Sequence, residues 1–110
     1  MTETVAAILA AHRAGQLSPA QTVARSYQRI RDHNDPAIFI TLRDEKQALA
    51  EAEALPTRKD AARLPLYGVP VAVKDNIDVA GLPTTSACPA FAYTPARDAT
   101  SVARLRAAGV

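Results

Sequence analysis

The sequence lacks several features that would assign it to particular classes of protein. It has one cysteine, Cys88, in 110 residues, so no disulfide can form within the chain, which suits a reducing compartment. No apolar run approaches the roughly 20 residues that span a bilayer. The first four residues carry neither the basic region nor the small-residue cleavage site of a signal peptide. We therefore expect a cytoplasmic protein with no membrane partner.

The sequence also lacks a large excess of either basic or acidic residues. Thirteen lysines and arginines oppose eleven acidic residues, the net charge is +2, and no run of five or six like charges occurs. A nucleic-acid surface normally needs a clustered basic face, so we expect no nucleic-acid partner. The two histidines, His12 and His33, lie in separate segments without a cysteine or carboxylate cluster beside them. This is a poor pattern for a metal site, and we expect neither a metal nor a cofactor.

Residues 1–56 read mainly as a helical region. Thr4 can cap a first helix with apolar positions at helical spacing. Ser18, followed by a proline and then by Gln21, forms the capping box of a second helix. Asp44 can cap a third helix, which a proline ends. The pattern therefore predicts three short helices before any chemistry-bearing segment is reached.

Two segments are predicted to be strands. Residues 37–42 are short, rich in β-formers and bounded by turn residues. Residues 66–73 are almost wholly apolar, which is typical of a buried strand. Pro70 indicates that the strand begins at this residue or is irregular there. The charged stretch 57–65 between them is predicted to be an exposed loop.

A last helix is predicted to be capped by Asp98 and closed by Gly109. Alternation of strands and helices describes an α/β protein, but two strands cannot form a sheet covered on both faces. We therefore expect the N-terminal portion of one domain, incomplete in this chain, in which the core sheet starts within residues 66–110.

Lys74 is the residue that most suggests chemistry. It directly follows the apolar run and precedes Asp75. A lysine at the end of a buried strand tends to lose solvent, which lowers its pKa and lets it act as a base. We expect its amine to point into a cavity. A lysine that extends to water, or one paired with Asp75 or Asp78, fits the local sequence as well.

Three consecutive hydroxyl residues, Thr84, Thr85 and Ser86, follow a Gly-Leu-Pro turn. They can shape a polar pocket or position Lys74. They can equally satisfy backbone groups within a tight loop. The sequence alone leaves both interpretations open.

The run from Leu66 to Asp78, with the core G-V-P-V-A-V-K-D-N, resembles the strand that delivers the catalytic lysine in the amidase-signature family. The likeness continues through residues 81–85 and 98–109. The resemblance implies an α/β fold with helices leading into a mixed sheet. It also implies a Ser–cis-Ser–Lys triad in which Lys74 matches the lysine. The family's two serines belong to a Gly/Ser-rich segment that these 110 residues do not contain.

Within the family, residues 87–95 resemble allophanate hydrolases, whereas most other members have Gly-Ser after the threonines. The resemblance implies hydrolysis of allophanate to ammonia and carbon dioxide, with a small-molecule substrate and a functional link to a biotin-dependent urea carboxylase. It is compatible with a homodimer. A general amidase and the A subunit of a tRNA-dependent amidotransferase stay open, as does a non-catalytic interaction fragment. Alone, the 110 residues are expected to be inactive.

Overall fold

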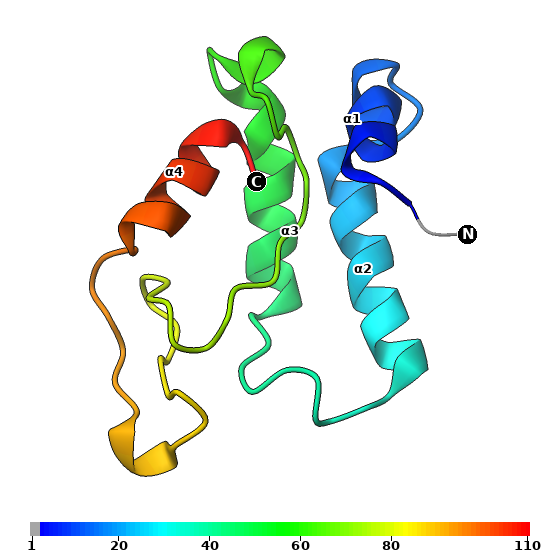
Figure 1. Ribbon diagram of the computed structural model, residues 1–110. Coiled ribbons are helices and arrows are strands. Elements are labelled where there is room, and N and C mark those ends of the chain that lie inside the picture. Colours follow the sequence, from blue (N-terminus) through cyan, green and yellow to red (C-terminus); the bar gives the residue numbers. More distant parts are fainter. Residues whose placement is uncertain (1–2) are drawn as a thin grey trace.

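The computed structural model describes residues 3–110, so the first two residues of the predicted helical region lie outside the described residues. Regular structure is helical: α1 (Val5–Arg13), α2 (Pro19–His33), α3 (Glu45–Ala54) and α4 (Thr100–Ala108), with single 3-10 turns at Leu55–Thr57, Ala61–Arg63 and Pro89–Phe91. Figure 1 shows α2 and α3 side by side, with α4 beside α3 on the side away from α2. No helix in residues 3–110 is both long and apolar enough to cross a membrane.

The predicted caps of the first three helices are confirmed. Thr4 and Asp44 each accept a hydrogen bond from the backbone N–H three residues further on. Ser18 Oγ accepts from the N–H of Gln21 at 3.1 Å, while the Gln21 side chain accepts from the N–H of Ser18 at 2.8 Å. These reciprocal bonds satisfy N–H groups that the helix itself leaves free. Local sequence therefore fixes where α1, α2 and α3 begin.

The predicted cap of the last helix is wrong. Ala99 occupies the N-cap of α4, and no side chain caps this helix. The carboxylate of Asp98 instead accepts from the N–H of Ala80 at 2.8 Å and lies 3.0 Å from Arg106 Nε. Two partners distant in sequence thus hold the side chain that local pattern assigned to the helix. The predicted closure at Gly109 is confirmed by its left-handed φ of 104°.

Neither predicted strand is present in the part of the chain that the structure describes. Residues 37–42 form turns and bends, with Ile38 54% and Ile40 58% exposed. Residues 71–73 make no backbone hydrogen bond with residues 3–110, and Val71 is 52% exposed. A strand exists only where a second strand takes up its N–H and C=O groups, and these two segments do not pair with each other. Between residues 3 and 110, β-pairing is confined to one antiparallel bridge, Thr84 with Tyr93.

The segment that leads toward Lys74 is held at its start by α1 and α2. The ring of His12 is buried, and its Nδ1 donates to the carbonyl oxygen of Tyr67. The next residue, Gly68, has a φ of +74° and packs so tightly that an added Cβ would lie 2.7 Å from Pro19 Cγ and 2.9 Å from His12 Cε1. Glycine is therefore required here both by backbone conformation and by space.

The end of α4 holds the same segment from the other side. The N–H of Leu66 donates to the carbonyl of Ala108, and the N–H of Gly68 donates to the carbonyl of Gly109, both at 2.8 Å. Leu64 and Val69, which flank these bonds, belong to the small buried hydrophobic core. Residues 64–69 are thus fixed between the N-terminal helices and α4, shortly before the exposed Val71 and Ala72.

Candidate functional site

Lys74 begins a tight turn on the surface. The N–H of Ile77 donates to the carbonyl oxygen of Lys74 at 3.0 Å. The Lys74 side chain is exposed, and its amine forms no ion pair with residues 3–110. The expectation that the amine points into a cavity is wrong for the described residues, because Lys74 is exposed, as are Val71 and Ala72 before it. The alternative of an ion pair with Asp75 or Asp78 is not observed either.

The residue after Lys74 is tightly hydrogen-bonded. The carboxylate of Asp75 accepts from the hydroxyl of Thr85, from the N–H of Thr85 at 3.2 Å and from the N–H of Ala87 at 3.3 Å. These bonds favour the charged form of the side chain. The hydrogen bond from Thr85, above all, lowers the pKa of Asp75 from its ordinary value. Asp75 is therefore held as a carboxylate beside the candidate base.

The turn that contacts Asp75 has an uncommon backbone. Ser86 and Ala87 have φ values of 50° and 59°, in the left-handed region that residues other than glycine rarely adopt. The N–H of Cys88 closes the turn by donating to the carbonyl of Thr85 at 2.8 Å. Turn and carboxylate stabilise each other, so Asp75 and residues 85–88 form one unit.

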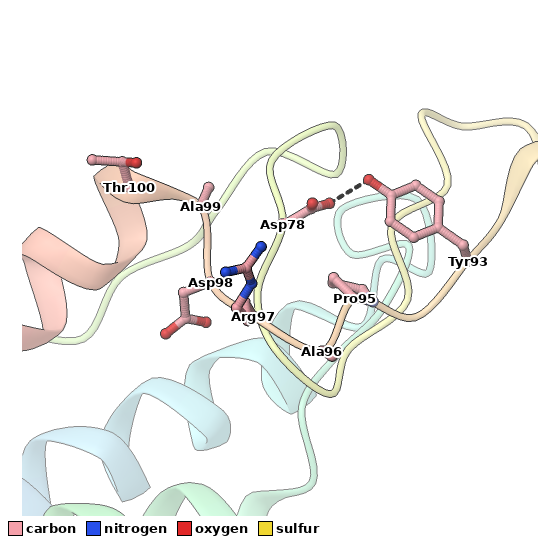
Figure 2. A pocket seen from close by; sticks show the side chains of 8 residues that line it. All are labelled: Asp78, Tyr93, Pro95, Ala96, Arg97, Asp98, Ala99 and Thr100. Carbon is pink, nitrogen blue, oxygen red and sulfur yellow. Dashed lines mark hydrogen bonds between the residues drawn. The ribbon is translucent and has the colours of Figure 1, made fainter.

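A second carboxylate, that of Asp78, is hydrogen-bonded to residues on either side of this turn. Asp78 Oδ1 accepts from Thr84 Oγ1 at 2.9 Å and from the hydroxyl of Tyr93 at 2.5 Å (Figure 2). Donation to Asp78 raises the pKa of the Tyr93 hydroxyl, because the carboxylate stabilises the protonated phenol. Both threonine hydroxyls therefore donate to carboxylates within the loop and do not surround the Lys74 amine. The predicted bond to a backbone group is present at Thr85, whose Oγ1 accepts from the N–H of Ala87 at 3.1 Å.

Two shallow pockets flank this loop. The larger, of about 580 Å³, is open and polar (Figure 2), and is lined by Asp78, Tyr93, Pro95, Ala96, Arg97, Asp98, Ala99 and Thr100. The smaller, of about 330 Å³, is mainly apolar and brings Ile40 next to Thr85 and Ala87. Lys74 lines neither pocket. Sequence patterns do not predict these hollows, because each combines residues from loops that are distant along the chain.

Side chains that could bind a metal ion do not cluster in the described part of the chain. Residues 3–110 contain no group of three or more histidine, cysteine, aspartate or glutamate side chains arranged to hold an ion. His12 is used elsewhere: its Nε2 lies 2.7 Å from Thr22 Oγ1.

The sequence model of the family described as Amidase matches residues 21–110. The chain belongs to the amidase family, which confirms the family predicted from the run around Lys74.

The chain is also similar to individual proteins of known sequence or structure. Urea amidolyase of Saccharomyces cerevisiae is 54% identical over 71 residues, which are 64% of this chain and 4% of that protein. The A subunit of the glutamyl-tRNA(Gln) amidotransferase of Chlorobium luteolum is 42% identical over 91 residues, 79% of this chain and 19% of its own length. The solved Kluyveromyces lactis allophanate hydrolase matches with a TM-score of 0.79 and 35% identity, over 99% of this chain and 18% of that one. The chain thus has the fold of a small part of that allophanate hydrolase.

Proposed function

We propose that this chain belongs to an amide hydrolase whose substrate is allophanate and whose products are ammonia and carbon dioxide. The proposal is supported by the similarity to urea amidolyase, which at 54% identity exceeds the 42% found for the amidotransferase relative. The likeness to the Kluyveromyces lactis allophanate hydrolase over nearly the whole chain supports it as well. The chain covers only a small share of each relative, so the activity is proposed for the complete enzyme.

In this proposal Lys74 is the general base of a Ser–cis-Ser–Lys triad. Its unprotonated amine takes a proton from the bridging serine, which in turn takes the proton of the nucleophilic serine. The activated oxygen attacks the amide carbonyl and the C–N bond breaks as the leaving nitrogen is protonated. Water then hydrolyses the acyl-enzyme and restores the serine. The dicarbamate that is released breaks down in water to carbon dioxide and the second ammonia. Backbone N–H groups would stabilise the oxyanion. The serines would come from a Gly/Ser-rich segment outside these 110 residues.

One observation carries the proposal for Lys74. Its backbone is fixed by the turn to Ile77 and by Asp75, while its amine stays unpaired with residues 3–110 and open to a partner. Lys46 and Lys59 are also exposed and form no ion pair with residues 3–110. Lys74 differs from them in its backbone, which is held on the C-terminal side, and in the family motif that contains it.

A second candidate is an A subunit of a tRNA-dependent amidotransferase or a general amidase. The match to the amidotransferase of Chlorobium luteolum, over 79% of the chain, favours keeping it. For the leading candidate we also propose a cytoplasmic enzyme, active as a homodimer, that receives its substrate from a biotin-dependent urea carboxylase.

Ammonia release by the complete purified enzyme separates these candidates. We expect kcat/KM for allophanate to exceed that for simple amides and for glutamine by about 100-fold or more, as sites built around specific polar groups achieve. Preference for simple amides would support the general amidase, and dependence on glutamine and charged tRNA would support the amidotransferase. No turnover of any amide would contradict the enzymatic proposal and favour an interaction role.

A further inference from the structure

Hydrogen bonds from one short turn converge on the residue that follows Lys74. The carboxylate of Asp75 accepts three, from the hydroxyl of Thr85 and from the N–H groups of Thr85 and Ala87. Its backbone carbonyl accepts from the N–H of Thr85 at 3.3 Å and of Ser86 at 3.1 Å. Both ends of Asp75 are thereby attached to residues 85–87, and Thr85 takes part through its side chain as well as its backbone.

Within residues 3–110, this attachment holds Lys74 from its C-terminal side. Residues 71–73 form no backbone hydrogen bonds with residues 3–110. The fixed points nearest to Lys74 therefore lie on its C-terminal side, at Asp75 and at the bond from Ile77 N–H to the Lys74 carbonyl. A change in the Asp75–Thr85 contact would move the Cα of Lys74, and with it the start of the side chain that carries the amine.

The backbone of the turn is adapted to Asp75. Ser86 and Ala87 adopt left-handed conformations, which are unfavourable for residues other than glycine. These conformations aim the N–H groups of both residues at Asp75, one at its carbonyl and one at its carboxylate. Strain of this kind persists where surrounding contacts offset it, and it is concentrated at functional sites.

We propose that Asp75 and Thr85 are positioning residues that hold Lys74 at the reach required of a general base. The inference rests on the proposed role of Lys74 in amide hydrolysis and adds to it the pair that fixes its place. Neither side chain is assigned contact with the substrate. Both act through the backbone of Lys74.

The hydroxyl of Thr85 gives the sharpest test, because valine removes it with little change in shape and serine keeps it. In the complete enzyme we expect Thr85→Val to lower kcat by about 10- to 100-fold, as displacements of about 1 Å at a reacting group do. KM should change by less than about threefold, since substrate contacts are untouched. Thr85→Ser should retain most of kcat. A Thr85→Val enzyme with full kcat, or a Thr85→Ser enzyme as slow as the valine variant, would overturn the proposal.

A double-mutant cycle separates positioning from general damage to the fold. In a Lys74→Ala background, followed by long incubations at high enzyme concentration, Thr85→Val should lower the residual rate no further. An equal loss in both backgrounds would show that the pair acts elsewhere and would overturn the inference. If Thr85→Val does not yield folded protein, Asp75→Asn carries the same expectation in the same two backgrounds. Unchanged kcat in Lys74→Ala alone would instead refute the base role of Lys74, so the two failures are distinguishable.

Discussion

The Nδ1 atom of His12 lies 2.9 Å from the carbonyl oxygen of Tyr67, a residue 55 positions further along the chain. A carbonyl oxygen only accepts, so Nδ1 carries the hydrogen of this bond. In the neutral ring Nε2 is then an acceptor, and the hydroxyl of Thr22, 2.7 Å away, is its donor. One buried ring thus joins α1, α2 and the segment that leads to Lys74.

Removing the Thr22 hydroxyl should destabilise this junction. Thr22 is 1% exposed, so Thr22→Val would leave Nε2 of His12 buried without a partner, at a cost of about 1–3 kcal/mol. Thr22→Ser, which keeps the hydroxyl and loses one methyl, should cost about 0.8 kcal/mol. Urea denaturation of the complete protein measures both. A valine variant as stable as the original would contradict the assigned bond.

The two glycines Gly68 and Gly15 form a matched pair for a steric test. Both have positive φ, of +74° and +70°, but only Gly68 has neighbours within reach of an added Cβ. Gly15→Ala should cost about 1 kcal/mol for the left-handed backbone alone. Gly68→Ala should cost about 1–3 kcal/mol more, because Pro19 and His12 must move. Equal melting temperatures of the two variants would disprove the close packing at Gly68.

Substitution of Lys74 distinguishes a base from a structural cation. In the complete enzyme Lys74→Ala should lower kcat by about 10²–10⁴-fold with little change in melting temperature, because the exposed amine makes no ion pair with residues 3–110. Lys74→Arg should be nearly as slow, since a guanidinium stays protonated and cannot accept the proton of a serine. An active arginine variant would rule out the base role.

Asp75 should contribute to the dependence of stability on pH. Its pKa is lowered in the folded state, mainly by the bond from Thr85, so the unfolded chain binds the proton more readily. The contribution is complete well above the ordinary value of 3.8 and is lost as pH falls through the lowered pKa. The difference in melting temperature between the original protein and Asp75→Asn should therefore shrink below about pH 4.

Asp60 supplies the control for that measurement. Its pKa is also lowered, chiefly by hydrogen bonding to Arg58, but it lies outside the turn that holds Lys74. Asp60→Asn should alter acid stability in the same direction and leave kcat unchanged. A comparable loss of kcat in both asparagine variants would argue against a special role for Asp75.

The 110-residue polypeptide itself should release no ammonia from allophanate or from simple amides. It offers Lys74 and lacks the Gly/Ser-rich segment to which the family's two triad serines belong. Ammonia assays on the purified polypeptide test this expectation. Turnover that follows the polypeptide through purification and disappears in Lys74→Ala would contradict it.

Sequence patterns predicted the elements that depend on neighbours in the chain. The capping box of Ser18 and Gln21 is complete within four residues and is present as expected. Asp98 was assigned to a helix by the same reasoning, yet Ala80 and Arg106 hold its carboxylate. Those partners are 18 and 8 positions away, and no local pattern identifies them.

The two predicted strands and the surroundings of Lys74 also depend on contacts between residues that are distant in sequence, which local patterns cannot predict. Composition identified residues 71–73 as β-forming, but a strand depends on partners that composition cannot supply. The motif identified Lys74, whereas the hold on Asp75 depends on Ser86 and Ala87 adopting a left-handed backbone that their residue types disfavour. Family likeness therefore located the candidate base, and only the structure identified the hydrogen bonds that hold the residue after it.

The free backbone of residues 71–73 has a consequence for how the protein is made. On the ribosome, α1, α2 and α3 can form from nearby residues soon after they emerge. Residues 71–73 follow them with β-branched side chains at Val71 and Val73 and no hydrogen-bonding partner among residues 3–110. While it is unpaired during synthesis, this stretch would be open to pairing with strands of other chains.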